Sequence, residues 1–216
     1  MFVLHEAIEA LGYVSSELNM KQLERLSKDD GGSRILYETC FLTNKLVEWR
    51  LVTQNGATEN LDLSLQKYNK FDHAPPYNFE AQPKYKDIEF VRSILLDNVN
   101  YDLFERYRAL YTLRELDTEE AVIAMCQCFK DENFGTCSAL LKHEVALVIS
   151  QMEDKYQPAV PYLLDCLENP KEEPIVRHEV LICLGMTLED DSKLERFRDD
   201  PDHVVSESAE AAIHLI

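Results

Sequence analysis

The stretch LLKHEVALVISQM, residues 140–152, places the dipeptide His143-Glu144 at the head of an almost wholly apolar run. Two other stretches share this phrase, MFVLHEAIEALGYV (1–14) and IVRHEVLICLGMT (175–187). Three of the six histidines therefore stand directly before a glutamate in the same kind of segment. One phrase that recurs along a chain predicts stacked helical repeats, in which each unit buries its apolar face against its neighbours.

Related phrases occur at residues 35–44, 103–113 and 204–215. A glutamate is the member that all six phrases share: Glu6, Glu38, Glu105, Glu144, Glu179 and Glu207. Shorter segments with apolar residues at three- and four-residue intervals precede the last three phrases, as expected of amphipathic helices with one buried face. The pattern predicts an all-α protein, an α-solenoid of HEAT-like helical hairpins.

Residues 50–86 interrupt this pattern, because they contain turn residues, three prolines and no helical period. They are predicted to form an irregular linker between a truncated N-terminal HEAT piece (1–49) and a C-terminal HEAT domain (87–216). The order of the phrases indicates that the two pieces are pseudo-symmetric. In that scheme residue 1 enters at the third phrase, and one His-Glu pair is expected to be missing.

The net charge of −18 excludes nucleic acid as a natural partner, since no basic stripe is present to neutralise phosphates. An acidic cleft would attract a cationic partner, although the acidity is equally consistent with a role in solubility alone. The apolar runs are short and broken by charges, and no secretory signal is visible. We therefore expect no membrane association and a cytoplasmic location.

The cysteines lie mostly in apolar helical phrases, where this residue acts as a small hydrophobe. They are Cys40, Cys126, Cys128, Cys137, Cys166 and Cys183. They follow no regular framework, which fits a reducing cytoplasm. A zinc interpretation of Cys126 and Cys128 has weak support, because a C-x-C motif without a second pair is a poor match to known zinc sites.

Adjacent residues on a helix do not face the same way, so one His-Glu pair cannot hold an ion unaided. Stacked repeats, however, would bring His143 and His178 within reach of one ion, and Glu179 would complete a set of two imidazoles and one carboxylate. This set suits non-haem Fe(II). Zinc has the same donors available and would favour hydrolysis instead. Glu144 would remain to hydrogen-bond a ligand or to meet a cationic substrate.

Any single pair is also compatible with ordinary surface residues near a helix start, where the helix dipole favours a glutamate. Three pairs in the same phase of three repeats favour the metal interpretation. The remaining histidines, His73, His203 and His214, are not followed by glutamate and are assigned no role.

Several of these segments resemble deoxyhypusine hydroxylases. LFERYRALYTLREL (103–116), SALLKHEVALVISQM (138–152) and DDPDHVVSESAEAAI (199–213) resemble the C-terminal half of that family. VLHEAIEALG (3–12) and YETCFLTNKLVEW (37–49) resemble the end of its N-terminal half. The resemblance covers nearly the whole chain. It implies a HEAT-repeat di-iron monooxygenase that uses O2 to hydroxylate the deoxyhypusine side chain of a translation factor, which yields hypusine.

In the family, four His-Glu pairs hold two Fe(2+) ions, with two pairs in each half. The metal ligands that the resemblance implies for this chain are His5, Glu6, His143, His178 and Glu179. The last three would form one complete iron site, and Glu144 would be the catalytic carboxylate that binds the substrate's amines. The second iron site is expected to be incomplete. The alternative is a non-catalytic HEAT scaffold, or an inactive truncated form.

Overall fold

The computed structural model describes residues 2–14, 25, 33–54, 72–130, 133, 135–152 and 154–216. Within these ranges the chain forms α-helices joined by loops and short 3₁₀ turns, and it forms no β-strand. The all-α prediction is confirmed. The rest of the predicted linker and of the N-terminal piece lies outside the described residues.

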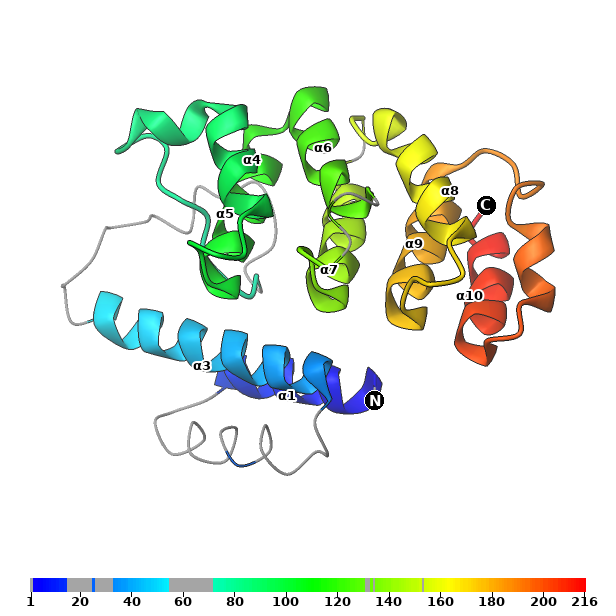
Figure 1. Ribbon diagram of the computed structural model, residues 1–216, viewed down its shortest axis with the longest axis horizontal. Coiled ribbons are helices and arrows are strands. Elements are labelled where there is room, and N and C mark those ends of the chain that lie inside the picture. The colour runs from blue at the N-terminus through cyan, green and yellow to red at the C-terminus, as the bar shows by residue number, and fades with distance from the viewer. Residues whose placement is uncertain are drawn as a thin grey trace.

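The C-terminal part has two layers of helices (Figure 1). The inner layer consists of α5 (Leu103–Leu116), α7 (Ala139–Ser150), α9 (Pro174–Thr187) and α10 (His203–Ile213). The outer layer consists of α4 (Ile88–Leu96), α6 (Glu119–Cys126), α8 (Val160–Glu168) and the 3₁₀ helix η6 (Glu195–Asp199). Each outer element packs on the inner helix that follows it, and α7 packs on α9, which packs on α10. This is the predicted array of HEAT-like hairpins.

The N-terminal helices α1 (Phe2–Val14) and α3 (Arg34–Gln54) pack on each other, and α3 contacts α5 and α7. In Figure 1 this pair lies across one end of the inner layer. The predicted boundary at residue 50 falls inside α3, because residues 50–54 contain neither glycine nor proline and continue the helix. The N-terminal piece thus closes over one end of the C-terminal solenoid.

The helix starts explain which repeat positions are equivalent. Ser138 caps α7 by accepting from the Leu141 N–H, and Glu173 precedes α9, which begins with a proline. Glu144 and Glu179 are both the sixth residue after these N-caps.

The recurring glutamate is therefore not one structural position. Glu105 is only the third residue after its N-cap Asp102, and Glu207 is the fifth after Asp202. Tyr107, the fifth residue after Asp102, takes the place in α5 that a histidine takes in α7 and α9. The shared glutamate of the phrases therefore marks equivalent positions in α7 and α9 but not in α5 or α10.

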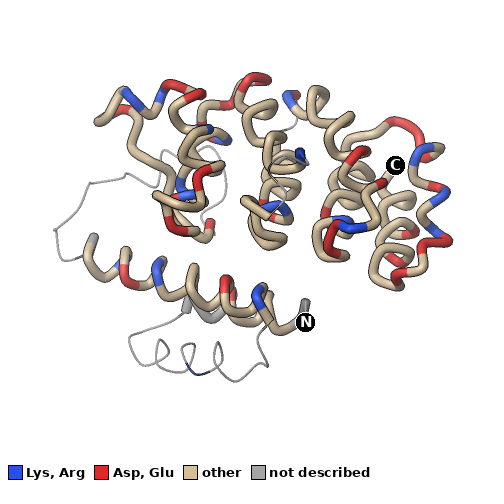
Figure 2. The backbone as a smooth tube through the Cα atoms, in the orientation of Figure 1, with Lys and Arg blue, Asp and Glu red and all other residues tan. Residues whose placement is uncertain are grey.

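Acidic and basic residues occur in both layers, with more acidic than basic positions (Figure 2). One extended apolar core fills the space between the layers and includes Val145, Val148 and Leu181. Gly185 lets α9 and α10 approach closely, because a Cβ at this position would lie 2.5 Å from the backbone oxygen of Ala212. That close approach brings the face of α9 that carries His178 against α10.

We expect Gly185→Ala to lower the free energy of unfolding by about 1–3 kcal/mol, as overpacking does in tight cores. Helix propensity alone would give the opposite sign, since alanine is favoured over glycine in helices by about 1 kcal/mol. Urea unfolding measures the difference. Met186→Ala is the matched control, because Met186 is 58% exposed on the next position. A stabilised Gly185→Ala variant would contradict the close contact.

Candidate metal centre

Stacking of α7 on α9 brings the predicted C-terminal set together. The His143 Nε2 atom lies 3.4 Å from Glu179 Oε2, and the His178 Nε2 atom lies 3.9 Å from the same oxygen. His143 and Glu179 are buried, and His178 is partly exposed. The carboxylate of Glu179 is therefore close to both imidazoles, as neighbouring repeats were expected to arrange them.

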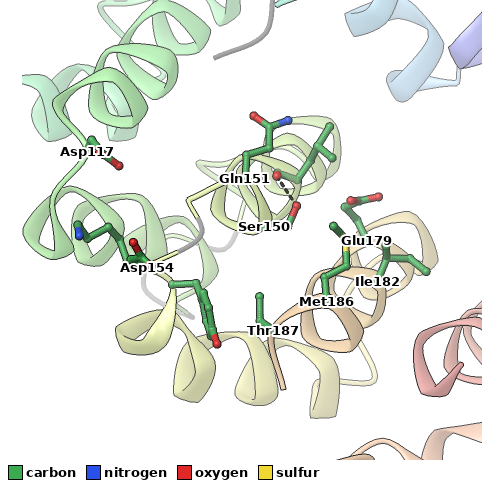
Figure 3. A pocket seen from close by; sticks show the side chains of 11 residues that line it. Asp117, Ser150, Gln151, Asp154, Glu179, Ile182, Met186 and Thr187 are labelled. Atoms are coloured by element: carbon green, nitrogen blue, oxygen red, sulfur yellow. Dashed lines mark hydrogen bonds between the residues drawn. The ribbon is translucent and has the colours of Figure 1, made fainter. Parts of the chain in front are cut away.

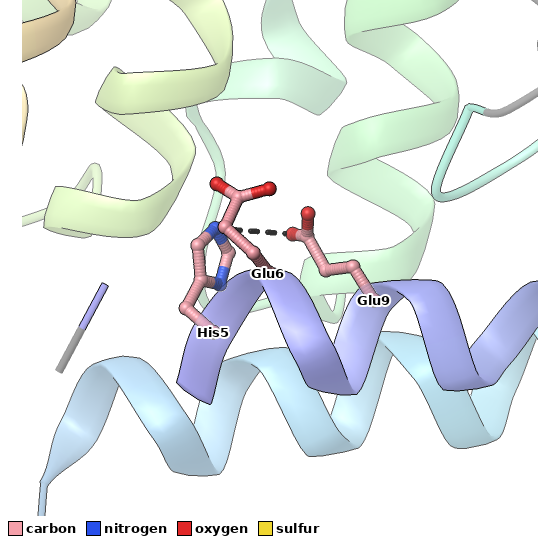
Figure 4. Close-up of side chains that lie close together, drawn as sticks. All are labelled: His5, Glu6 and Glu9. Atoms are coloured by element: carbon pink, nitrogen blue, oxygen red, sulfur yellow. Dashed lines mark ion pairs between the residues drawn. The ribbon is translucent and has the colours of Figure 1, made fainter. Parts of the chain in front are cut away.

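Helix α1 carries the N-terminal set to the same place. The ring of His5 meets the ring of His143 edge-on, with centroids 5.8 Å apart. His5 Nε2 lies 3.2 Å from Glu9 Oε1, one turn further along α1. His5, Glu6 and Glu9 each offer a ligand atom within 4.8 Å of the others (Figure 4). Among the described residues this set is the more compact, and the C-terminal set is more open.

Two histidines are oriented by the same device. His5 Nδ1 lies 2.8 Å from Thr39 Oγ1 on α3, and that hydroxyl donates to the Ile35 carbonyl. Because the hydroxyl proton is used there, the bond to His5 runs from Nδ1–H to Thr39. The lone pair of Nε2 is then directed at Glu9. A hydrogen bond of this kind fixes the tautomer of a metal-binding imidazole.

His178 repeats this arrangement on α10. Its Nδ1 lies 2.6 Å from Ser208 Oγ, and this hydroxyl donates to the Val204 carbonyl. The pairs His5–Thr39 and His178–Ser208 thus match between α1–α3 and α9–α10. This match supports the proposal that the two pieces of the chain are pseudo-symmetric.

His73, which sequence reasoning left without a role, belongs to the cluster. Its Nε2 lies 3.4 Å from Glu144 Oε2 and 3.4 Å from Glu9 Oε1. Burial disfavours the imidazolium, but Glu144 and then Glu9 outweigh this effect and raise the pKa of His73 to about 9. No repeat phrase contains His73. The sequence therefore gave no indication that this residue belongs to the cluster, apart from its position before Ala-Pro-Pro.

Glu144 is fully enclosed by groups that stabilise its charge. The Tyr111 hydroxyl donates to its Oε1 at 2.8 Å, and His73 faces its Oε2. Burial alone would raise the pKa of Glu144, but His73 and His143 lower it to about 2. In this arrangement an imidazole stands where the sequence analysis expected a substrate amine.

The other groups show how strongly the site is desolvated. Burial, together with the imidazoles of His143 and His73, lowers the pKa of His5 to about 4. Burial and the carboxylates of Glu144 and Glu6 raise the pKa of Glu9 to about 7. A neutral imidazole beside a carboxylate in a dry site provides lone pairs that a shared proton or a bound cation can hold together.

The residues present fit a metal ion. Ligands that share an ion at about 2.1 Å are separated by about 3.0–3.4 Å. The His143–Glu179 and His5–Glu9 atom pairs fall in that range, and the His178–Glu179 pair, at 3.9 Å, is wider. Two imidazoles with a carboxylate form the donor set that non-haem Fe(II) uses. Among the described residues, the buried His143 Nδ1 has no hydrogen-bond partner.

A pocket of about 860 Å³ adjoins this centre and reaches Glu179. It lies beside the C-terminal ends of α5, α7 and α9 (Figure 3). Asp117 and Asp154 contribute carboxylates, while Ile182 and Met186 contribute apolar surface. The pocket can therefore hold a chain that is both aliphatic and cationic.

The remaining predicted features lie away from the centre. Cys126 and Cys128 are buried, and burial raises the pKa of the Cys126 thiol, which disfavours the thiolate that zinc requires. His203 forms an exposed pair with Glu207, and His214 bonds to the Glu210 carbonyl. Among the described residues, no helix is long and apolar enough to cross a membrane.

Comparison with known proteins identifies relatives along nearly the whole chain. A deoxyhypusine hydroxylase of Schizosaccharomyces pombe is 36% identical over all of this chain and 65% of its own length. The human deoxyhypusine hydroxylase is 34% identical over 99% of this chain and 64% of its own length. The chain is similar to deoxyhypusine hydroxylases along nearly its whole length. No protein-family model matches it.

A solved structure of human deoxyhypusine hydroxylase in complex with glycerol has the same fold, with a TM-score of 0.79 at 34% identity. The match covers 98% of this chain and 66% of the human chain. This deoxyhypusine hydroxylase homologue thus spans somewhat less than two thirds of the length of the curated relatives, as the Schizosaccharomyces and human proteins show.

We expect the His73 imidazole of this deoxyhypusine hydroxylase homologue to remain protonated at pH 7.5 in metal-free protein and to titrate near 9. Because this pKa is raised, the pair with Glu144 stabilises the fold fully below about pH 6.5. That contribution is lost as the pH rises through about 9. NMR of the ring nitrogens, assigned with His73→Gln, measures the titration. A midpoint near 6.5 would contradict the buried pairing.

Proposed function

We propose that the protein is an iron-dependent monooxygenase that hydroxylates the deoxyhypusine side chain of a translation factor with O2. The observation that carries the proposal is that Glu179 Oε2 lies near the imidazoles of both His143 and His178, on two stacked repeats beside an acidic pocket. The naming of the relatives supports the same reaction. No observation favours the alternative of a non-catalytic scaffold.

The substrate's chemistry fits the pocket. A deoxyhypusine side chain is aliphatic and carries amines that are protonated at neutral pH. Carboxylates at Asp117 and Asp154 would bind them by charge-assisted hydrogen bonds, and Ile182 would pack on the methylenes. The net charge of −18 would help to recruit a cationic substrate. It also supports a partner that is a protein and not a nucleic acid.

The residues of the centre would have two roles, as iron ligands and as a binding group for the substrate. His143, His178 and Glu179 would hold one Fe(2+), and His5 and Glu6 would contribute to a second. Iron supplies the oxidising chemistry with O2 when it is bound. Glu144, which has a pKa of about 2 and so stays ionised, would hold a substrate amine near the centre. The buried surroundings exclude bulk water, which strengthens these interactions. A cytoplasmic location is part of the proposal.

We expect His178→Ala to remove one equivalent of iron per chain. The two donors that remain at the C-terminal site, His143 and Glu179, are too few to hold the ion. Iron is counted by elemental analysis after anaerobic loading. His203→Ala is the matched control, since His203 is exposed on the neighbouring helix. Iron content equal to the control would contradict the ligand assignment.

Glu144→Gln tests substrate binding separately. The amide keeps a partner for the Tyr111 hydroxyl but loses the negative charge. We expect iron content to be unchanged and the affinity for a deoxyhypusine-containing protein to fall about 10- to 100-fold, the value of a charged hydrogen bond. Calorimetry measures the affinity, with the exposed Glu207→Gln as control. Loss of iron in Glu144→Gln would show that this carboxylate is instead a ligand.

The reaction itself is tested by incubating the iron-loaded chain with O2, a reductant and the deoxyhypusine-containing protein. Mass spectrometry should show the gain of one oxygen atom on that side chain. An unchanged substrate, with iron bound, would contradict the proposed activity of this chain.

A further inference from the structure

We propose that His73 is a metal ligand, which together with His5, Glu6 and Glu9 gives this chain a second metal site of its own. The inference rests on the proposed function, since it concerns the second ion of the same centre. It replaces the expectation that the second site is incomplete. No repeat phrase supplies His73, which comes from the segment between α3 and α4.

The contacts of Glu9 carry the proposal. Its Oε1 atom lies 3.2 Å from His5 Nε2 and 3.4 Å from His73 Nε2. Each separation is that of two neighbouring ligands on one ion bound at about 2.1 Å. The ligand atom of Glu6 lies within 4.8 Å of those of His5 and Glu9. The carboxylate of Glu9 thus faces both imidazoles, and imidazoles with carboxylates are a donor set for Fe(II) or Zn²⁺.

The tautomer of His5 agrees with this assignment. Its Nδ1–H donates to Thr39, so the nitrogen near Glu9 carries a lone pair and not a proton. A lone pair that faces a carboxylate oxygen at 3.2 Å is repulsive unless a proton or a cation lies between them. The ring is buried, so bulk water does not relieve this repulsion.

His73 is held in position on both sides by the rest of the fold. The buried Arg114 of α5 binds both carboxylate oxygens of Asp72, the preceding residue. The backbone N–H of His73 donates to the Tyr111 hydroxyl, and Ala74 is completely buried. Ligands of a metal site need this kind of support, because the backbone of a loose loop does not fix an imidazole.

The competing interpretation is that His73 serves only as an ion-pair partner of Glu144 and Glu9. The two roles differ in what can replace the residue. Lysine preserves a positive charge at this position but does not serve as an iron ligand at neutral pH, whereas glutamine preserves neither role. An imidazole whose Nε2 binds a metal also cannot donate to Glu144. Loading the second site would therefore leave that carboxylate available to a substrate amine.

The test is a count of metal ions in the full chain, titrated anaerobically with Fe(II) and, in parallel, with Co(II), whose visible spectrum reports imidazole ligands. We expect two ions per chain in the unchanged protein and one in both His73→Gln and His73→Lys. His203→Gln, an exposed histidine outside the cluster, should retain two. Thermal unfolding of each metal-free variant shows whether it is folded, and His73→Lys should keep the stability that the ion pair contributes.

The outcomes separate this inference from the proposed function. Two ions in folded His73→Gln or His73→Lys would overturn the inference. One ion in the unchanged protein, lost in His178→Ala and retained in His73→Gln, would also overturn it while supporting the C-terminal site. Loss of an ion in His73→Gln but not in His178→Ala would support the inference and contradict the ligand set on which the proposed function depends.

Discussion

The contact between α7 and α9 is the constraint on which the site depends. It brings His143 within 3.4 Å of Glu179, although these residues belong to different repeats. Neither His-Glu pair could hold an ion alone, since adjacent side chains on a helix diverge. The apolar residues that follow each pair, such as Val145 and Leu181, are buried in the common core and fix the distance between the helices. The geometry of the site thus depends on the packing of this core.

The hydroxyls of Thr39 and Ser208 show a second level of organisation. Each uses its own proton within its helix and can only accept from the imidazole that it faces. In this way a neighbouring helix sets the direction of a histidine lone pair. Gly185 allows α9 and α10 to come close enough for one of these contacts. Helix packing therefore places each hydroxyl, and the hydroxyl in turn sets the direction in which the histidine lone pair points.

Much of this architecture follows from the sequence, and the reason is periodicity. The repeated phrase predicted the helices, the stacking and the meeting of His143 with Glu179. Periodicity could not place His73, because that residue lies in an irregular segment whose path is fixed by the side chains of Asp72 and Arg114. It also grouped Glu105 with Glu144 and Glu179, although Glu105 is the third residue after its N-cap and the other two are the sixth after theirs. A periodic sequence pattern therefore says least about contacts between an irregular segment and a helix.

The most direct test of the central claim is anomalous diffraction at the iron absorption edge, from crystals of the iron-loaded chain. We expect a peak bounded by the Nε2 atoms of His143 and His178 and by the Glu179 carboxylate. Iron located elsewhere, with these three side chains unliganded, would contradict the account.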